Sequence, residues 1–600
     1  MTNETDITYI PYQQPGEPAR RAAFIPVEFD LDNLSDEQLQ VAGHLIEAVH
    51  AINPVFRDQF EPRTEKIETL AHLLLEHAAG EEKELLNNYL QILNLQNSPY
   101  SLLPRKNHLL QIPLERLQDL ARQSGTEALQ LLEEVSAFFY EDIPTPDFAN
   151  FYPQDFTGEE FKELGEQGSI VNSCVVRGKD GKAEVVLNED IYRKTLSRAV
   201  EHLRAARDHC SDEGFIKYLD AKIREMETGS EEARREADAA WIRHDSSIDI
   251  VISSALEVYL DAYKNIRGAA TGGVYLRNEA AQSLLEAIVE RVDRFELEAP
   301  WTWKKESIDP DNLPELKFVD VLAWSGDYVT SPNTTLAQSL PNDRWVIENV
   351  GTVNMVFNNT TRAISRVTGQ LMAEEFLPAG EAERVRAELF DGSQLHSALH
   401  EIGHTTGRMD PDHSSGQPSD YLEEEYSWLE EARAELFGIW AMPLLVEDRV
   451  ISQETAQASC AGFLMTMLGA LRFEPVQAHT MARNLIFHAY EQEGALSVST
   501  ETGKERFMLN PQKIYPVTAD LLKMVADIKA AGDKDAAVRL RERWMYTDPR
   551  RRELDERTSM LPLGRGLIFP QMEKDEDRYT DRLRYPGSFS KQPLFQNKLA

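Results

Sequence analysis

The sequence predicts a predominantly α-helical α+β protein that folds as more than one lobe. A chain of 600 residues is too long for a single hydrophobic core, so two or more lobes are expected. Residues with high helix propensity dominate the composition, whereas short strand-like runs are few. Apolar residues make up 42% of the chain and charged residues 27%, a balance typical of a globular protein.

Helical periodicity is clearest in two long stretches. Residues 34–140 begin with a capping box formed by Ser35 and Gln38, after which apolar residues recur at helical spacing. Residues 361–486 are again mostly helical in pattern. We therefore expect helices to dominate both halves of the chain.

Strand patterns are short and scattered. Residues 249–253 and 318–323 each predict a buried strand. Residues 496–509 predict a hairpin with its turn near Thr502 and Gly503.

The composition also restricts the partners and the compartment. A formal net charge of −38 repels nucleic-acid phosphates and anionic lipid, so neither partner is expected. Three cysteines, Cys174, Cys210 and Cys460, are too few for a disulfide framework and favour a reducing compartment. The first residues lack the features of a signal peptide, and the most apolar runs are too short to span a bilayer. These observations predict a cytoplasmic protein.

A metal-binding motif stands out in the second half of the chain. Residues 400–404 read HEIGH, which is an H-E-x-x-H motif. Positions i and i+4 lie on one face of a helix, so His400 and His404 can both bind one ion at about 2.0–2.1 Å. Glu401 can then act as the general base toward the attacking water. Ser393 is expected to cap this helix. The alternative is a surface helix with two unrelated histidines.

A second helix, predicted over residues 419–442, offers the third ligand. Glu431 and Glu435 are spaced i, i+4, so one of them can bind the metal while the other hydrogen-bonds a ligand histidine from behind. Gly438 would allow a neighbouring helix to approach closely. Residues 423–425 are expected to form an ordinary acidic, solvated face.

At these residues the sequence resembles the dipeptidyl peptidase III family of zinc metallopeptidases (M49), in a divergent bacterial-type branch with a short first motif. The family pairs such a histidine motif with a later E-E-x-R-A-E segment, which stands here at residues 430–435. The resemblance implies one zinc ion per chain, held by His400, His404 and Glu431. It also implies that Glu435 is the hydrogen-bonding partner behind the ligands.

Two further segments extend this resemblance to the substrate site. Residues 478–483 match the family's A-H-x-x-A-R segment, which implies that His479 stabilises the oxyanion and that Arg483 binds the substrate backbone. Asn342 matches the second asparagine of the family's N-x-P-N segment, which binds the peptide main chain, whereas Ser339 replaces the first asparagine.

One departure from the family falls on the substrate site. Asp249 and Val251 stand where the family has a glutamate and a catalytic tyrosine. Asp249 can still bind a substrate amino terminus. Val251 cannot donate a hydrogen bond, and the loss of such a donor costs about 10²–10³ in rate where the donor is used.

The resemblance also implies an architecture of two lobes around a cleft. A helical lobe would hold the zinc, and the other lobe would combine a small β-barrel with helices. The expected limits are 1–270 for the N-terminal lobe, 271–322 for part of the helical lobe, 323–368 for a return to the barrel lobe, 369–547 for the catalytic lobe with the zinc site, and 548–600 for a tail that packs on the barrel lobe.

The function expected from these residues is removal of dipeptides from the amino end of short oligopeptides. The sequence leaves open a zinc hydrolase of a non-peptide amide or ester, because Val251 and Ser339 alter the expected substrate contacts. It also leaves open a non-catalytic peptide-binding protein. Cobalt or manganese in place of zinc is equally compatible with the motif.

Overall fold

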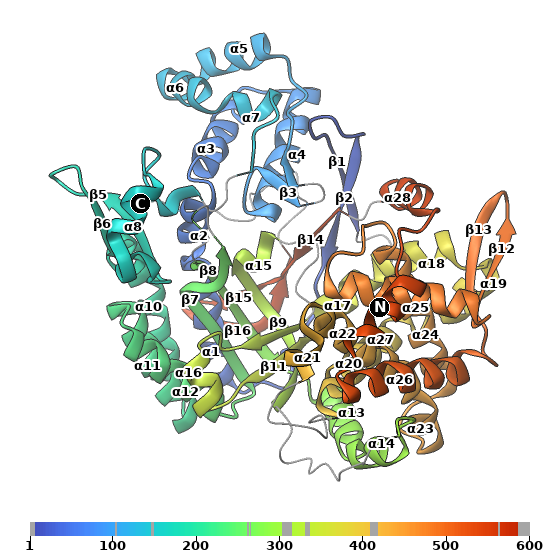
Figure 1. Ribbon diagram of the computed structural model, residues 1–600. Helices are drawn as coiled ribbons and strands as arrows, with labels where there is room; N and C mark the ends of the chain where they lie inside the picture. The colour runs from blue at the N-terminus through green and yellow to red at the C-terminus, as the bar shows by residue number, and fades with distance from the viewer. Residues whose placement is uncertain are drawn as a thin grey trace. The chain divides into compact units, whose positions relative to one another are not determined.

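The computed structural model describes residues 7–102, 105–145, 149–260, 263, 266–302, 315–330, 337–407, 418–561 and 564–585. The chain forms two compact units (Figure 1). Unit 1 comprises residues 1–277, 315–363 and 564–600, and unit 2 comprises residues 278–314 and 364–563. Helices dominate both units, which confirms the predicted α+β, predominantly α-helical class.

Unit 1 contains most of the strands together with a large helical part. Its helices are α1 (Asp36–Ala51), α2 (Asn53–Phe60), α3 (Thr64–Leu75), α4 (Gly80–Gln96), α5 (Leu114–Ser124), α6 (Thr126–Val135), α7 (Ala137–Tyr140), α8 (Gly158–Leu164), α9 (Asn188–Ile191), α10 (Arg193–His209), α11 (Glu213–Thr228), α12 (Glu231–Arg243), α15 (Asp327–Thr330), α16 (Arg344–Asn349) and α17 (Asn358–Ile364). The predicted capping box is confirmed, because the Ser35 side chain accepts from Gln38 N and the Gln38 side chain accepts from Ser35 N.

A mixed five-stranded sheet lies at the centre of unit 1. Its strands run in the order β10 (Ala337–Leu340), β11 (Val353–Phe357), β9 (Glu315–Gly326), β8 (Ile266–Arg277) and β7 (Ile248–Leu260). The strands predicted at 249–253 and 318–323 are the buried parts of β7 and β9. Helices α1 and α2 pack on β8, and the alternate residues Ile248, Ile250 and Ile252 of β7 are buried in this core.

The remaining sheets of unit 1 are small. Strands from near the two ends of the described chain meet in a three-stranded sheet ordered β1 (Thr8–Tyr12), β2 (Arg20–Pro26) and β14 (Gly564–Ile568). Two-stranded pairs are formed by β3 (Tyr100–Leu102) with β4 (Arg105–Asn107), β5 (Ser173–Arg177) with β6 (Ala183–Leu187), and β15 (Gln571–Asp575) with β16 (Arg578–Arg584).

The small β-barrel expected from the resemblance is not found among the described strands. The five-stranded sheet is open, since β10 and β7 lie at its two ends and do not pair with each other. The fold class therefore holds at the level of α+β, while this detail of unit 1 is corrected from a barrel to an open mixed sheet.

Unit 2 is almost entirely helical. Its helices are α13 (Glu279–Val289), α14 (Val292–Glu298), α18 (Gln370–Phe376), α19 (Ala379–Val385), α20 (Leu389–Thr405), α21 (Pro418–Leu422), α22 (Tyr426–Trp440), α23 (Met442–Glu447), α24 (Gln453–Ala470), α25 (Ala478–Gln492), α26 (Ile514–Ala531), α27 (Lys534–Trp544) and α28 (Arg551–Ser559). The predicted hairpin is confirmed as β12 (Leu496–Glu501) and β13 (Lys504–Leu509), with positive φ angles at Thr502 and Gly503 in its turn.

The divisions between the units differ from those expected from the sequence. They fall after residues 277, 314, 363 and 563, whereas the sequence placed them after 270, 322, 368 and 547. The first two differences have a common cause, because residues 271–277 of β8 pair with residues 319–326 of β9 and the two strands therefore stay in one unit. Helix α28 explains the last difference, since it belongs to unit 2.

Two further findings concern the whole described chain. Among the described helices, none combines the length and the apolar character that crossing a bilayer requires. Cys174, Cys210 and Cys460 are all described, and each is a free thiol.

Candidate metal centre

The HEIGH sequence lies in helix α20, as its spacing predicts. The helix begins four residues before Ser393, so the predicted cap is wrong, and the Ser393 hydroxyl instead donates to the Leu389 carbonyl at 2.7 Å. A Cβ atom at the neighbouring Gly392 would come within 2.4 Å of Ser459 N in α24. Close packing of α20 on α24, rather than a turn, explains this glycine.

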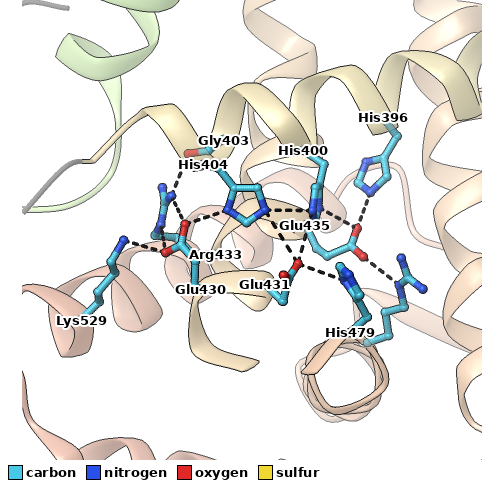
Figure 2. Close-up of polar contacts among 11 residues, drawn as sticks. His396, His400, Gly403, His404, Glu430, Glu431, Arg433, Glu435, His479 and Lys529 are labelled. Atoms are coloured by element: carbon cyan, nitrogen blue, oxygen red, sulfur yellow. Dashed lines mark hydrogen bonds and ion pairs between the residues drawn. The ribbon is translucent and has the colours of Figure 1, made fainter. Parts of the chain in front are cut away.

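Helices α20 and α22 approach each other closely through two glycines. A Cβ atom at Gly438 would lie 2.8 Å from Nδ1 of His396, and one at Gly403 would lie 3.2 Å from Cα of Ala434. Both positions therefore exclude larger side chains, which confirms the role predicted for Gly438. This close approach brings the two motifs to face each other in unit 2 (Figure 2).

Three predicted metal ligands converge between these helices. The ligand atoms of His400, His404 and Glu431 all lie within 4.8 Å of one another. The two Nε2 atoms of the histidines are 3.1 Å apart. The Oε2 atom of Glu431 lies 3.3 Å from Nε2 of His400 and 3.8 Å from Nε2 of His404 (Figure 2).

These donors fit a zinc ion. Two imidazoles bound to one tetrahedral ion at about 2.0–2.1 Å place their nitrogens about 3.3 Å apart, close to the spacing seen here. The buried Glu431 Oε2 atom has no hydrogen bond of normal geometry in the described part of the chain, although histidine nitrogens surround it. A site of two imidazoles and one carboxylate is a common donor set of catalytic zinc.

The protonation of the ligands reflects the charges packed around them. Burial alone would lower the pKa of His400, but its contacts with Glu431 and Glu435 outweigh burial and raise the pKa to about 10. Burial alone would raise the pKa of Glu431, but His400 and His479 lower it to about 2. In the ion-free chain a proton therefore occupies the position that a metal would take on His400.

Glu435 lies behind the ligands, although its strongest contacts are with other residues. Its Oε2 atom accepts a hydrogen bond from His396 Nε2 at 2.7 Å, and its Oε1 atom accepts one from Arg483 Nε at 2.7 Å. His400 Nδ1 lies 3.6 Å away, which is an ion-pair distance rather than a hydrogen bond. Burial would raise the pKa of Glu435, but Arg483 and the histidines hold it well below its usual range.

Sequence reasoning missed a second carboxylate, Glu430, and its partners. His404 Nδ1 donates to Glu430 Oε1 at 2.8 Å, which is the shortest contact between a ligand histidine and an outer carboxylate in Figure 2. Arg433 and Lys529 contact the same carboxylate. The spacing of Glu430 and Arg433, three residues apart within the second motif, was the available signal, whereas Lys529 comes from a helix far along the chain.

The predicted catalytic residues lie next to this centre. Glu401 is half-buried and follows His400 on α20, close enough for its charge to act on that imidazole. His479 is the second residue of α25, and its Nδ1 atom lies 2.9 Å from Glu431 Oε2 with about half of its side chain exposed. Arg483 lies one turn further along α25.

The other two predicted substrate residues belong to unit 1. Trp241 Nε1 lies 3.0 and 3.1 Å from the carboxylate oxygens of Asp249, and Ile250 N donates to Oδ1 at 2.7 Å. Asp249 is buried, so a contact with a substrate amino group requires one of these partners to give way. Asn342 is exposed and donates to the Leu256 carbonyl at 3.1 Å.

The chain is similar to peptidase family M49. The family model matches residues 166–438, a range that contains both metal-site motifs. This match confirms the predicted resemblance, and the class of enzyme that follows is a metallopeptidase.

Two curated relatives and two solved structures are similar to this chain. "Nudix hydrolase 3" of Arabidopsis thaliana is 24% identical, and the match covers 92% of this chain and 73% of the relative. "Dipeptidyl peptidase 3" of Nematostella vectensis is 21% identical, and the match covers 51% of this chain and 44% of the relative. DPP III from Caldithrix abyssi matches with a TM-score of 0.74 and 24% identity, covering 91% of this chain and 97% of the other. Dipeptidyl-peptidase III from Corallococcus sp. strain EGB has a TM-score of 0.63 and 23% identity, covering 91% and 95%. These structures establish the shared fold.

Proposed function

We propose that this protein is a zinc metallopeptidase that releases dipeptides from the amino end of short peptides. The convergence of His400, His404 and Glu431, with Glu401 beside them on the same helix, is the observation that carries this proposal. The similarity to proteins named as dipeptidyl peptidases supports peptides as the substrate class.

The residues around the centre have complementary roles in this reaction. When bound, zinc polarises the scissile carbonyl and lowers the pKa of a water molecule to about 7. Glu401 would accept the proton of the attacking water and transfer it to the leaving amine. His479, whose Nδ1 atom lies 2.9 Å from Glu431 Oε2, would stabilise the developing oxyanion.

Three further residues would hold the peptide. Arg483 is tied to Glu435 through Nε, which leaves its remaining guanidinium donors for the substrate backbone. Asn342 is exposed and would bind the peptide main chain. Asp249 would bind the amino terminus only after releasing part of its present contacts.

Glu401→Gln is the direct test, assayed on a panel of dipeptidyl-arylamides. The substitution keeps the shape of the side chain but removes the base, so turnover should fall about 10²–10⁴-fold. Zinc content should stay at one ion per chain, because Glu401 is not a ligand. Unchanged turnover on every substrate would show that the proposed mechanism is wrong.

A zinc hydrolase of another amide or an ester is the second candidate, and Val251 favours it. Val251 lines a pocket within unit 1, together with Asn342 and Trp241, of about 540 Å³ including its open mouth. An apolar group there offers no hydrogen bond to a substrate or transition state. Full zinc occupancy without arylamide turnover, but with turnover of simple esters, would favour this candidate. Peptide binding without any hydrolysis would instead favour a binding protein.

A further inference from the structure

The Glu430 carboxylate behind His404 has all of its acceptor positions in use. Its Oε1 atom accepts from His404 Nδ1 at 2.8 Å and from Arg433 Nη2 at 2.6 Å. Its Oε2 atom accepts from Arg433 Nε at 3.0 Å and from Lys529 Nζ at 2.6 Å (Figure 2). Four charge-assisted contacts leave this carboxylate no freedom to rotate.

The charge of Glu430 decides which nitrogen of His404 carries a proton. The guanidinium of Arg433 and the ammonium of Lys529 both contact the Glu430 carboxylate, and these ion pairs favour its ionised form. An ionised carboxylate only accepts hydrogen bonds, so Nδ1 of His404 must donate. The lone pair of the neutral imidazole then lies on Nε2, which faces His400 and Glu431.

Arg433 connects this carboxylate to the helix that carries the ligand. Its side chain is fully buried, and Nη2 also donates to the Gly403 carbonyl at 2.7 Å, in the last turn of α20. A cation at this position satisfies a terminal carbonyl and is favoured by the helix dipole. One planar guanidinium therefore fixes Glu430 relative to the residue that precedes His404.

Lys529 adds a second buried cation to the surroundings of Glu430. It comes from α26, its side chain is 8% exposed, and its ammonium contacts Glu430. The buried Glu296 also acts electrostatically on Arg433, so Arg433 and Lys529 together balance two buried carboxylates. The contact secures the Oε2 atom, which keeps Oε1 turned toward His404.

We propose that Arg433 and Lys529 are positioning residues that act on the metal through Glu430, by holding its carboxylate as the fixed acceptor for His404 Nδ1. This inference rests on the proposed zinc function, since it concerns how His404 is presented to the ion. Helix α26, which supplies no predicted ligand, would then contribute to metal binding through Lys529.

The test is the zinc dissociation constant, measured by competition with a chromogenic chelator at fixed pH. Glu430→Gln should weaken zinc binding about 10- to 100-fold, as expected for the loss of an outer hydrogen-bond partner. Lys529→Met should weaken it about 10-fold. The double variant Glu430→Gln/Lys529→Met should bind no more weakly than Glu430→Gln alone, because Lys529 acts through Glu430.

Lys523→Met is the matched control. Lys523 lies on the same helix, pairs with Asp527 rather than with Glu430 and has 41% of its side chain exposed, so its loss should leave zinc affinity unchanged. If Lys529→Met does not fold, Arg433→Lys is the second variant: it keeps the charge but cannot contact Glu430 and Gly403 together, and it should also lose affinity only when Glu430 is present.

The outcomes separate this inference from the proposed function. A parent protein that binds zinc tightly while Lys529→Met binds it equally well overturns the inference alone. The inference is also overturned if the double variant loses zinc affinity by the product of the two single fold-losses. A parent protein that binds no zinc would instead defeat the proposed function.

Discussion

The two histidine ligands of the candidate metal centre have outer partners of different kinds. His404 donates to Glu430 at 2.8 Å, and that carboxylate is held by Arg433 and Lys529, both buried. His400 lies 3.6 Å from Glu435, whose hydrogen bonds go to His396 and Arg483 instead. Both carboxylates, Glu430 and Glu435, belong to the second motif. Only Glu430 accepts a hydrogen bond from a ligand histidine.

From this difference we infer that the two carboxylates have different roles. Glu430 fixes the orientation of a ligand, whereas Glu435 connects the centre to Arg483, a residue proposed to bind substrate. The contact between Glu430 and His404 should govern zinc affinity. The contact between Glu435 and Arg483 should have more effect on substrate binding. The following experiments test this contrast.

The largest effect is expected from removing a ligand itself. His404→Ala should lose most of its bound zinc, because one of three protein ligands supplies roughly a third of about 10–16 kcal/mol of binding free energy. Elemental analysis after dialysis against a weak chelator measures the loss. If a folded His404→Ala protein kept the zinc content of the parent, His404 would not be a ligand. The comparison of the two ligand histidines would then fail.

The comparison itself is tested by matched glutamine variants. Glu430→Gln should weaken zinc binding about 100-fold, whereas Glu435→Gln should weaken it about 10-fold, both within the range for outer partners. Glu435→Gln should in addition raise KM for dipeptidyl-arylamides, since it releases Arg483. Equal zinc losses, or the reverse order, would show that the two carboxylates do not differ in this way.

The packing that brings the two helices together should be sensitive to a single methyl group. Gly438→Ala places a Cβ atom 2.8 Å from Nδ1 of His396, so the free energy of unfolding should fall by about 2 kcal/mol. Gly469→Ala is the control, because it lies in helix α24 with no atom near its Cβ position and should be neutral or slightly stabilising. Chemical denaturation of both variants gives the difference, and a Gly438→Ala protein as stable as the control would contradict this packing.

The smallest effect is a pH dependence that belongs to His400. Since its pKa in the ion-free chain is raised to about 10, zinc must displace one proton from it at neutral pH. Below this pKa the protonated ring cannot bind the ion, so affinity should fall about tenfold for each unit by which the pH is lowered. Titration calorimetry in buffers of different ionisation enthalpy should detect about one proton released per zinc ion bound. Release of no proton at pH 7 would contradict the raised pKa.

The sequence alone predicted the features of this centre that depend on short spacing. His400 and His404 are one helical turn apart, and Glu431 and Glu435 are too, so periodicity was enough to place each pair on one face of a helix. The close approach at Gly438 also followed from the residue type. The helical class was likewise visible in composition and periodicity.

The rest depended on contacts between distant segments. Lys529 lies 99 residues from Glu430 in the chain, so no local pattern connects them. The packing of Gly392 against α24 likewise joins two segments that are far apart in the sequence. The open sheet of unit 1 is decided by which strands pair, and short strand patterns do not specify their partners.

The most direct test is a crystal structure of the zinc-loaded protein with anomalous diffraction data at the zinc edge. The account predicts one strong peak within about 2.0–2.2 Å of His400 Nε2, His404 Nε2 and a carboxylate oxygen of Glu431. A peak bound by other residues, or a zinc-loaded crystal with no density between α20 and α22, would contradict it.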